Sequence, residues 1–467
     1  MRRACLIPTL CLAFAVTTFA SSEINRTQWP QFLGPNGQPT AFEQTVPTTF
    51  GPDENLLWRI DLPSGHSSPC IWGNHLFLSA YEGKNLIMLA IDRRDGSLLW
   101  KQNVQAKSET DFIHRAACPA QSTPCTDGEL VYFYFGSYGL VALDFDGKLA
   151  WEKRLSSPRS KFGAGTSPIL YGDSLLINRD DTDDPCILSL NSKTGETRWK
   201  HPRFGYRTNQ STPFVWNNRL RTELVFAGTR SLVSLNPDSG ELLWKAEDTC
   251  ALPCSSPTGN NDMLFFASWT ANHVGGQDKL QAHFDDDIGF TQDEMEKPEA
   301  FFARFDADKD NRITREELPQ SRARDVFKWI DRNRDDSWDQ DEFKILLRPA
   351  GDGRNIMVAV KAGGNGLLND TTFVAWERSK HLPYVATPLL SGDRVYLVKS
   401  LGVITCLNTS TGIPYFEGER TGVKGEYYAS PIKIGNRIFL TSSLGTVIVI
   451  RDSESFEILA KNILEEE

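Results

Sequence analysis

Two acidic stretches of the chain space their oxygen-bearing side chains as a divalent cation requires. Residues 306–317 and 331–342 carry such side chains at positions 1, 3, 5, 9 and 12. A hard cation such as Ca²⁺ takes roughly six to eight oxygen ligands, with short carboxylates on alternate positions, a main-chain carbonyl at position 7 and a bidentate glutamate at position 12. The predicted calcium ligands are Asp306, Asp308, Asp310, Arg312, Thr314 and Glu317 in the first loop and Asp331, Asn333, Asp335, Ser337, Asp339 and Glu342 in the second.

The residues around both loops predict a pair of helix–loop–helix units of the EF-hand type. Apolar residues at helical spacing precede each loop, namely Phe301, Phe302 and Phe305 before the first and Val326, Phe327 and Ile330 before the second. Position 8 is apolar in both loops, which predicts a short β contact between Ile313 and Trp338. Position 6 favours glycine but holds Asn311 and Asp336, so we expect weakened affinity rather than lost binding. The alternative is a helical pair that binds no metal.

The composition predicts a large core and an acidic charge concentrated in one segment. The chain has 467 residues, 40% of them hydrophobic, with 12 Trp and 27 Phe. Its formal net charge of −10 argues against nucleic acid or an anionic membrane surface as a partner. Residues 285–344 hold 19 acidic and 11 basic side chains, so the calcium segment carries most of this charge. A further acidic run, residues 180–184, is interpreted as a solvated turn, with a second kind of cation site as the alternative.

Residues 1–20 predict a secretory signal peptide. Arg2 and Arg3 precede an apolar run over residues 4–16, and Thr18-Phe19-Ala20 follows before Ser21. The run is too short to span a bilayer, and no later stretch is apolar enough to do so. We therefore expect an exported protein, periplasmic or extracellular, without a transmembrane segment.

Seven cysteines follow the signal peptide: Cys70, Cys118, Cys125, Cys186, Cys250, Cys254 and Cys406. The odd number leaves at least one thiol unpaired. Local disulfides between Cys118 and Cys125 or between Cys250 and Cys254 are one interpretation, and buried single thiols are the other.

A repeat organises most of the chain. A hydroxyl residue followed by Pro recurs seven times at the head of a β-rich run, with prolines at positions 69, 124, 168, 213, 257, 388 and 431. These prolines are 43 to 55 residues apart, except for one gap of 131 residues that equals one repeat plus the calcium segment. Four units end in a turn glycine followed four residues later by tryptophan: Gly96 and Trp100, Gly147 and Trp151, Gly195 and Trp199, Gly240 and Trp244. Weaker copies end at Trp376 and Phe416. Such a repeat is typical of a propeller blade of four short strands.

The predicted fold class is all-β, a seven-bladed β-propeller with a small α-helical EF-hand pair inserted between the second and third strands of blade five. The predicted domains are the signal peptide 1–20, the first part of the propeller 21–284, the EF-hand insert 285–348 and the rest of the propeller 349–467. Each proline suits the start of a strand, and each closing tryptophan is expected to pack between neighbouring blades. Residues 56–58 are interpreted as an outer strand that closes the ring against the last unit. Because residues 456–464 also fit the fourth strand of that unit, eight blades are the alternative.

The repeat with its Asp/Thr-Gly-x-x-x-Trp ending resembles the pyrroloquinoline-quinone-like (PQQ-like) propeller repeat, which also builds the propeller lipoprotein of the outer-membrane β-barrel assembly machine. Residues 29–37, Trp-Pro-Gln-Phe-Leu-Gly-Pro-Asn-Gly, resemble the start of exported bacterial proteins of this repeat family. Quinone-dependent dehydrogenases of the family hold their cofactor against a disulfide of adjacent cysteines and a calcium ion. This chain has no Cys-Cys pair.

We therefore expect an exported calcium-binding β-propeller that acts as a protein- or ligand-binding scaffold, with another protein or a cell-surface component as its partner and Ca²⁺ as its cofactor. No catalytic residue is assigned. The alternative is a PQQ-type quinone-dependent or sugar oxidoreductase with its site in the central funnel.

Overall fold

The computed structural model describes a chain that is mostly β. The described residues are 28–41, 46–106, 117–158, 162–180, 182, 184–203, 209–270, 291, 294, 297–321, 324, 327, 331, 335–340, 342–343, 353–369 and 371–464. The predicted signal peptide, residues 1–20, lies outside them. Among the described residues, no helix has both the length and the apolar character needed to cross a membrane.

In the described part of the chain, the strands form seven sheets of four or five strands and one of two strands. Sheet 1 contains β3 (Cys70–Trp72), β4 (His75–Glu82), β5 (Asn85–Asp92) and β6 (Leu98–Gln105). Sheet 2 contains β7 (Cys125–Thr126), β8 (Leu130–Phe135), β9 (Gly139–Asp144) and β10 (Leu149–Arg154). Sheet 3 contains β11 (Ile169–Tyr171), β12 (Ser174–Asn178), β13 (Cys186–Asn191) and β14 (Thr197–Pro202). Sheet 4 contains β15 (Phe214–Asn217), β16 (Thr222–Gly228), β17 (Ser231–Leu235) and β18 (Leu242–Glu247). Sheet 5 contains β19 (Thr258–Gly259), β20 (Met263–Ser268), β23 (Ile356–Lys361) and β25 (Val374–Arg378). Sheet 6 contains β26 (Leu389–Ser391), β27 (Arg394–Lys399), β28 (Val403–Asn408) and β29 (Pro414–Arg420). Sheet 7 contains β30 (Ile432–Ile434), β31 (Arg437–Thr441), β32 (Thr446–Arg451) and β33 (Ile458–Ile463).

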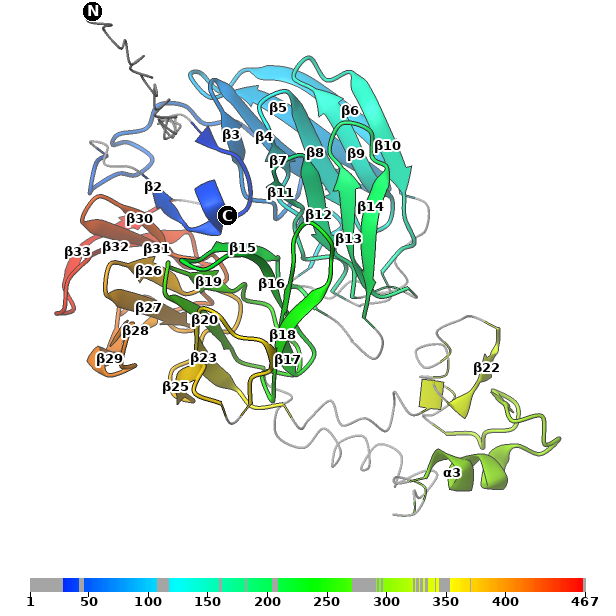
Figure 1. Ribbon diagram of the computed structural model, residues 1–467. Helices are drawn as coiled ribbons and strands as arrows, with labels where there is room; N and C mark the ends of the chain where they lie inside the picture. The colour runs from blue at the N-terminus through cyan, green and yellow to red at the C-terminus, as the bar shows by residue number, and fades with distance from the viewer. Residues whose placement is uncertain are drawn as a thin grey trace, which may run out of the picture.

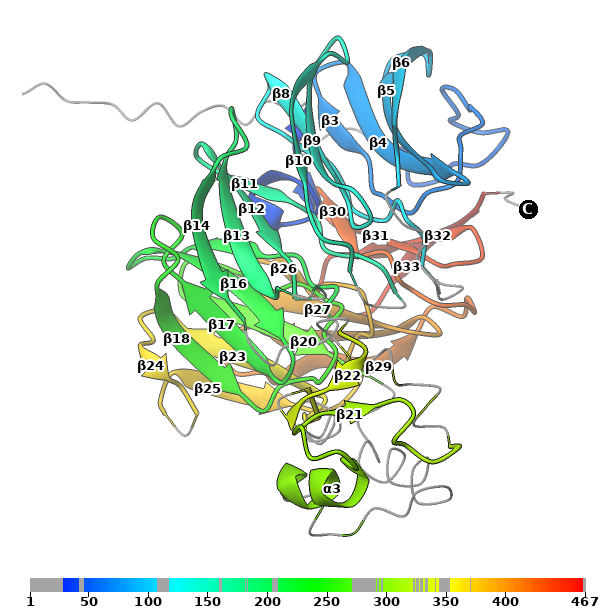
Figure 2. The ribbon, with the colours of Figure 1, turned by 90° about the vertical axis from the view of Figure 1, so that its right-hand side faces the viewer.

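The seven sheets follow one another around a common axis, an arrangement consistent with a β-propeller (Figures 1 and 2). Within each sheet the four strands are antiparallel and pair in chain order. The first strands of neighbouring sheets contact each other, for example β3 with β7 and β15 with β19, so these strands line the axis. The first strand of every sheet begins directly after one of the seven prolines, as the repeat predicted. Proline is tolerated there because its missing N–H takes nothing from the strand ladder.

The hydroxyl residue before each proline links its sheet to the next. The backbone N–H of Ser167 donates to Thr212 Oγ1, and the N–H of Thr212 donates to Ser256 Oγ, both at 3.0 Å. The same bond, at 3.0 to 3.1 Å, joins Ser68 to Thr123, Thr123 to Ser167, Ser256 to Thr387, and Thr387 to Ser430. A buried N–H without an acceptor is costly, and each of these N–H groups finds its acceptor on the next sheet. We call this chain of bonds the hydroxyl relay.

The tryptophan of a fourth strand packs on the following sheet, which confirms the predicted position of these residues between neighbouring units. Trp100 Nε1 donates to the carbonyl of Phe145 at 2.8 Å, and Trp376 Nε1 donates to the carbonyl of Thr409 at 2.9 Å. The indole of Trp100 covers Gly147, where a Cβ would come within 2.9 Å of the ring. Gly147 also has a φ of +80°, so glycine is required for two independent reasons.

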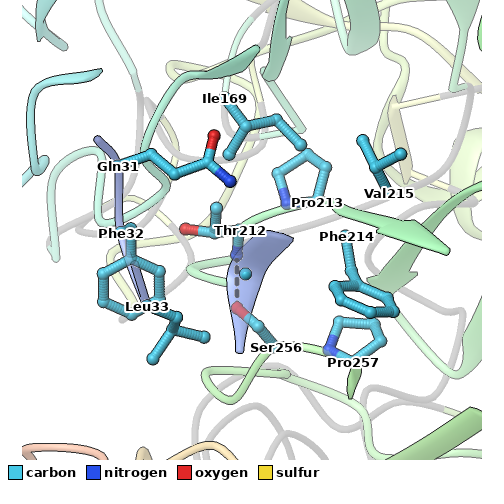
Figure 3. A pocket seen from close by; sticks show the side chains of 11 residues that line it. Gln31, Phe32, Leu33, Ile169, Thr212, Pro213, Phe214, Val215, Ser256 and Pro257 are labelled. Carbon is cyan, nitrogen blue, oxygen red and sulfur yellow. Dashed lines mark hydrogen bonds between the residues drawn. The ribbon is translucent and has the colours of Figure 1, made fainter. Parts of the chain in front are cut away.

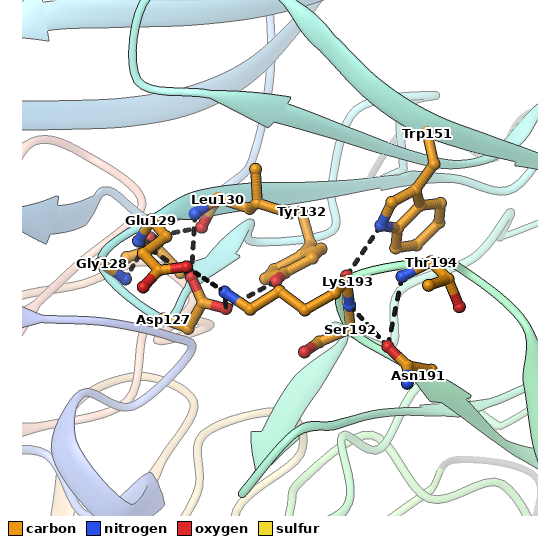
Figure 4. A network of polar contacts seen from close by, with 11 residues as sticks. Asp127, Gly128, Glu129, Leu130, Tyr132, Trp151, Asn191, Ser192, Lys193 and Thr194 are labelled. Atoms are coloured by element: carbon orange, nitrogen blue, oxygen red, sulfur yellow. Dashed lines mark hydrogen bonds and ion pairs between the residues drawn. The ribbon is translucent and has the colours of Figure 1, made fainter.

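Polar contacts reinforce the junction of sheets 2 and 3 (Figure 4). Trp151 Nε1 donates to the carbonyl of Ser192 at 2.7 Å. The neighbouring Lys193 Nζ lies 3.0 Å from the carboxylate of Asp127, which also accepts a hydrogen bond from the Tyr132 hydroxyl at 2.7 Å. Burial raises the pKa of Asp127, but the backbone N–H groups, Tyr132 and Lys193 outweigh that effect, so its pKa is lowered overall.

Residues 56–58 form no strand, so their prediction as an outer strand is wrong. Leu57 is 90% exposed, and Trp58 Nε1 donates to the carbonyl of Arg93 at 2.9 Å, against Gly96 of sheet 1. Trp58 therefore makes on sheet 1 the contact that a fourth-strand tryptophan makes on sheets 2, 3, 4 and 6. The predicted fourth strand near the C-terminus is confirmed, because β33 pairs with β32.

An N-terminal segment, residues 28–41, joins the first and last sheets at the axis. Its β1 (Gln28–Trp29) pairs antiparallel with β3, and its β2 (Thr40–Ala41) pairs parallel with β30. A short 3₁₀ helix, η1 (Pro35–Gly37), lies between these two strands. We call residues 28–41 the N-terminal clasp, since sheets 1 and 7 are far apart in the sequence and both bond to it.

Removing one hydroxyl from the relay should destabilise the fold. Thr212→Val leaves the buried N–H of Ser167 without its acceptor, so we expect the free energy of unfolding to fall by about 1–3 kcal/mol. The matched control is Thr258→Val, because the buried hydroxyl of Thr258 has no hydrogen-bond partner in the structure as described. Urea denaturation should show no loss for this control. An equal loss in both variants would contradict the role assigned to the relay.

Candidate metal centre

The chain leaves sheet 5 between its second and third strands, where the repeat spacing placed an insertion. β20 and β23 pair directly over six residues, from Met263 with Lys361 to Ser268 with Ile356. The predicted insert boundaries at residues 285 and 348 lie outside the described residues. Helix α3 (Pro298–Phe305) contains the three phenylalanines expected to be helical before the first loop. Phe327 is also helical, whereas Val326 and Ile330 lie outside the description.

The insert has an aromatic core of its own. The rings of Phe301 and Phe343 stack with centroids 4.1 Å apart, and those of Phe327 and Trp338 stack at 4.9 Å. Trp338 Nε1 donates to the carbonyl of Phe327 at 2.9 Å. All four side chains are buried. These contacts hold the segments that flank the two loops together.

The two loops meet through a short antiparallel contact, as predicted from position 8. β21 (Ile313–Thr314) pairs with β22 (Ser337–Trp338), and Ile313 lies opposite Trp338. Ile313 and Trp338 are fully buried. This pairing fixes the two loops side by side.

The first loop gathers three of its predicted ligands. Carboxylate oxygens of Asp306, Asp308 and Glu317 all lie within 4.8 Å of one another. The backbone curls around them: Asp306 accepts hydrogen bonds from the N–H groups of Asp310 at 3.2 Å and Asn311 at 2.9 Å. Both oxygens of Glu317 likewise accept backbone N–H groups from the same loop. Such an arrangement presents several anionic oxygens to one point, as a hard cation requires.

Two other predicted ligands of this loop make bonds within the loop instead. Asp310 accepts the N–H of Arg312 at 2.8 Å, and the Thr314 hydroxyl donates to Glu317 at 2.9 Å. Neither belongs to the group of three converging carboxylates. The first loop is therefore only partly arranged as the spacing predicts.

The second loop repeats the backbone pattern of the first. Asp331 accepts the N–H groups of Asp335 at 3.2 Å and Asp336 at 3.1 Å, and Glu342 accepts the N–H of Asp339 at 3.1 Å. Within the described part of the chain, no second group of three converging acids is found here. Asn333, its predicted position 3, lies outside the described residues.

One contact of the second loop was not foreseen from the sequence. The guanidinium of Arg312 bonds to the carboxylate of Asp335, and its Nη1 donates to Ser337 Oγ at 2.8 Å. Arg312 was expected to contribute only a main-chain carbonyl, and sequence spacing carries no signal for a contact between two loops.

Position 6 adopts the backbone conformation that glycine prefers in both loops. The φ angles of Asn311 and Asp336 are 61° and 60°. Asn and Asp tolerate this region better than other non-glycine residues, since their short polar side chains bond locally. The loops therefore keep their turn without glycine.

The carboxylates of the loops crowd one another. The N–H of Asp310 lowers the pKa of Asp308, but burial and the neighbouring acids Asp310, Glu317 and Asp306 raise it above its ordinary value overall. A bound divalent cation would relieve this repulsion. In the second loop, the Ser337 hydroxyl and then the Arg312 guanidinium lower the pKa of Asp335 to about 2.

A small pocket lies between the N-terminal clasp and the first strands of sheets 3 to 5 (Figure 3). It is lined by Gln31, Phe32, Leu33, Gly37, Ile169, Thr212, Pro213, Phe214, Val215, Ser256 and Pro257. Gln31 Oε1 accepts the N–H of Leu170 at 3.2 Å, so the clasp is bonded to the wall of the channel. The lining offers apolar surface, hydroxyls and one amide.

The acidic run at residues 180–184 is not a solvated turn at Asp180, so that interpretation is wrong there. Asp180 is 1% exposed and forms a buried ion pair with Arg203, whose Nη2 lies 2.8 Å from its carboxylate. Asn209 donates to the same carboxylate at 2.8 Å. An opposite charge and hydrogen bonds are what make a buried carboxylate tolerable. Asp181 and Asp183 lie outside the described residues.

All seven cysteines of the predicted mature chain are free thiols, and six of them are buried. The two local disulfides considered from the sequence are therefore not formed. Burial raises the pKa of the Cys186 and Cys250 thiols to about 11. Thiols of this kind behave as small apolar side chains rather than as nucleophiles.

Comparison with known proteins identifies the repeat. Residues 51–161, which include sheets 1 and 2, match the family described as outer membrane protein assembly factor BamB, so these sheets carry a PQQ-like propeller repeat. Similar solved structures include BamB from Moraxella catarrhalis, with 14% identity, a TM-score of 0.47 and 84% of each chain covered. Another is the quinohemoprotein alcohol dehydrogenase from Comamonas testosteroni, with 12% identity, a TM-score of 0.44, and 92% of this chain and 79% of that chain covered. Similarity at this level carries no argument about activity. No curated protein matches the sequence significantly.

Glycine at position 6 should raise the calcium affinity of the first loop. Asn311→Gly relieves a left-handed backbone that costs an L residue of this type a few tenths to about 1 kcal/mol, so calcium affinity should rise about twofold to fivefold. Calorimetric titration in a Glu342→Gln background reports on the first loop alone. The control is Arg315→Gly, a residue of the same loop without positive φ, which should weaken binding. Unchanged or weaker binding by Asn311→Gly would contradict this account of the turn.

Proposed function

We propose that the protein is an exported, seven-bladed β-propeller that acts as a protein-binding scaffold and holds two calcium ions in an EF-hand pair inserted in its fifth blade. The observation that carries the calcium proposal is the convergence of Asp306, Asp308 and Glu317 oxygens within 4.8 Å. The spacing of these residues in the sequence and the pairing of the two loops support the same ion.

Calcium suits this site better than a softer or smaller metal. The predicted ligands are carboxylates, hydroxyls and main-chain carbonyls, without cysteine or histidine, which favours a hard cation. The loops are built from flexible turns, and Ca²⁺ tolerates irregular coordination where Mg²⁺ demands a near-ideal octahedron. Calcium is plentiful outside the cytosol, so its role here is to keep the insert folded rather than to transmit a signal.

The scaffold role rests on the ring. The described residues form seven sheets of at least four strands, with β33 as the fourth strand of the last, and this count supports seven blades rather than eight. The match of residues 51–161 to the BamB family supports a protein partner, because assembly factors act by contacting other proteins. The signal peptide predicted from the sequence of residues 1–20 supports export. In this proposal the ring is a rigid platform from which the insert, over residues 285–348, projects.

Calcium should stabilise the insert, and the glutamates at position 12 should be needed for this effect. A ligand that binds only the folded state adds about 2.7 kcal/mol at a concentration 100 times its Kd. Scanning calorimetry of the full chain should therefore show a higher midpoint for the insert in calcium than in chelator. The double variant Glu317→Gln, Glu342→Gln should remove this rise.

Glu316→Gln is the matched control for this experiment. Glu316 is exposed and occupies position 11, which supplies no ligand, so the rise in midpoint should persist. A rise that survives in the double variant, or one that Glu316→Gln also removes, would show that the ligands are wrongly assigned.

A further inference from the structure

The two loops share one side chain. Arg312 occupies position 7 of the first loop, yet its guanidinium bonds to Asp335 at position 5 of the second loop. Its Nη1 also donates to Ser337 Oγ at 2.8 Å. The antiparallel contact of β21 with β22 brings the two residues together. A predicted ligand of the second loop therefore already has a cationic partner from the first.

The arrangement is not symmetric. Position 7 of the second loop is Ser337, whose neutral hydroxyl donates to Asp335 of its own loop at 2.6 Å. Position 7 of the second loop therefore places no positive charge near the carboxylates of the first loop. The first loop gathers Asp306, Asp308 and Glu317, none of which is an ion-pair partner of Arg312. The guanidinium of Arg312 therefore forms its ion pair with the second loop, although its charge also interacts with Asp310 of its own loop.

A guanidinium and a calcium ion compete for the same carboxylate. Calcium in the second loop must either displace Arg312 from Asp335 or lie within a few ångströms of its positive charge. The side chains of Arg312 and Asp335 are 44% and 32% exposed, so solvent screens their interaction and the pair can open. Competition of this kind weakens a site without abolishing it.

We propose that Arg312 determines the affinity of the second loop and makes the two calcium sites unequal. The first loop fills first, and the second is a weaker site that binds calcium only when the guanidinium gives up Asp335. This inference rests on the proposed function. It also assigns Arg312 to both sites, since its main-chain carbonyl is a predicted ligand of the first.

Calorimetric titration of the full chain with calcium chloride tests the proposal. Glu342→Gln leaves only the first site and Glu317→Gln only the second, and the second should bind at least about tenfold more weakly. In the Glu317→Gln background, Arg312→Ser gives position 7 of the first loop the serine that position 7 of the second loop already has. It should raise the affinity of the second site about tenfold. Arg312→Gln, which keeps most of the side-chain length, should do the same and serves as a second variant.

Lys309→Ser is the matched control for charge. Lys309 is an exposed cation of the first loop that forms no ion pair with Asp335 in the described structure, so its removal should change the calcium affinity of the second site by less than about twofold. Two wild-type sites of equal affinity, or equal effects of Arg312→Ser and Lys309→Ser, would overturn the inference and leave the proposed function standing. Absence of binding heat at both loops of the wild-type chain would instead contradict the proposed function.

Discussion

Each sheet of this protein is too small to bury both of its faces alone, so its stability depends on its two neighbours. The hydroxyl relay meets this constraint with one bond at each of the six junctions between consecutive sheets, where a Ser or Thr side chain accepts the N–H of the preceding sheet. Four of the fourth-strand tryptophans, Trp100, Trp151, Trp199 and Trp376, add apolar contact and a second hydrogen bond to the next sheet. The sequence repeat therefore reflects a contact between sheets that is repeated around the ring. The proline, the hydroxyl residue, the glycine and the tryptophan each have a separate role in this contact.

Closure of the ring uses different residues from the other junctions. Trp58 covers Gly96 of sheet 1 without belonging to a strand, and the N-terminal clasp pairs with the innermost strands of sheets 1 and 7. The chain can therefore absorb a long insertion elsewhere. β20 and β23 keep a continuous register although the insert separates them in the sequence, and the insert packs its own aromatic core around Phe301 and Trp338. Ring and insert thus obtain their stability from separate sets of contacts.

Features that depend on local chemistry were predictable from the sequence. The strand starts follow from proline, the positive φ of Asn311 follows from its loop position, and the pairing of Ile313 with Trp338 follows from apolar residues at position 8. The failures involve partners that folding brings together. The sequence predicted a solvated Asp180 because its partner Arg203 lies 23 residues further along the chain. It predicted a strand over residues 56–58 because their pattern does not reveal that Trp58 bonds to the carbonyl of Arg93. The bond between Arg312 and Asp335 likewise has no signature in either loop alone.

Anomalous diffraction would reveal directly whether the insert binds calcium. Crystals of the full chain grown in millimolar calcium should show two anomalous peaks, one enclosed by Asp306, Asp308 and Glu317 and a weaker one beside Asp335 and Glu342. Two loops without anomalous density at that concentration, with their carboxylates turned toward solvent, would contradict calcium binding by the insert.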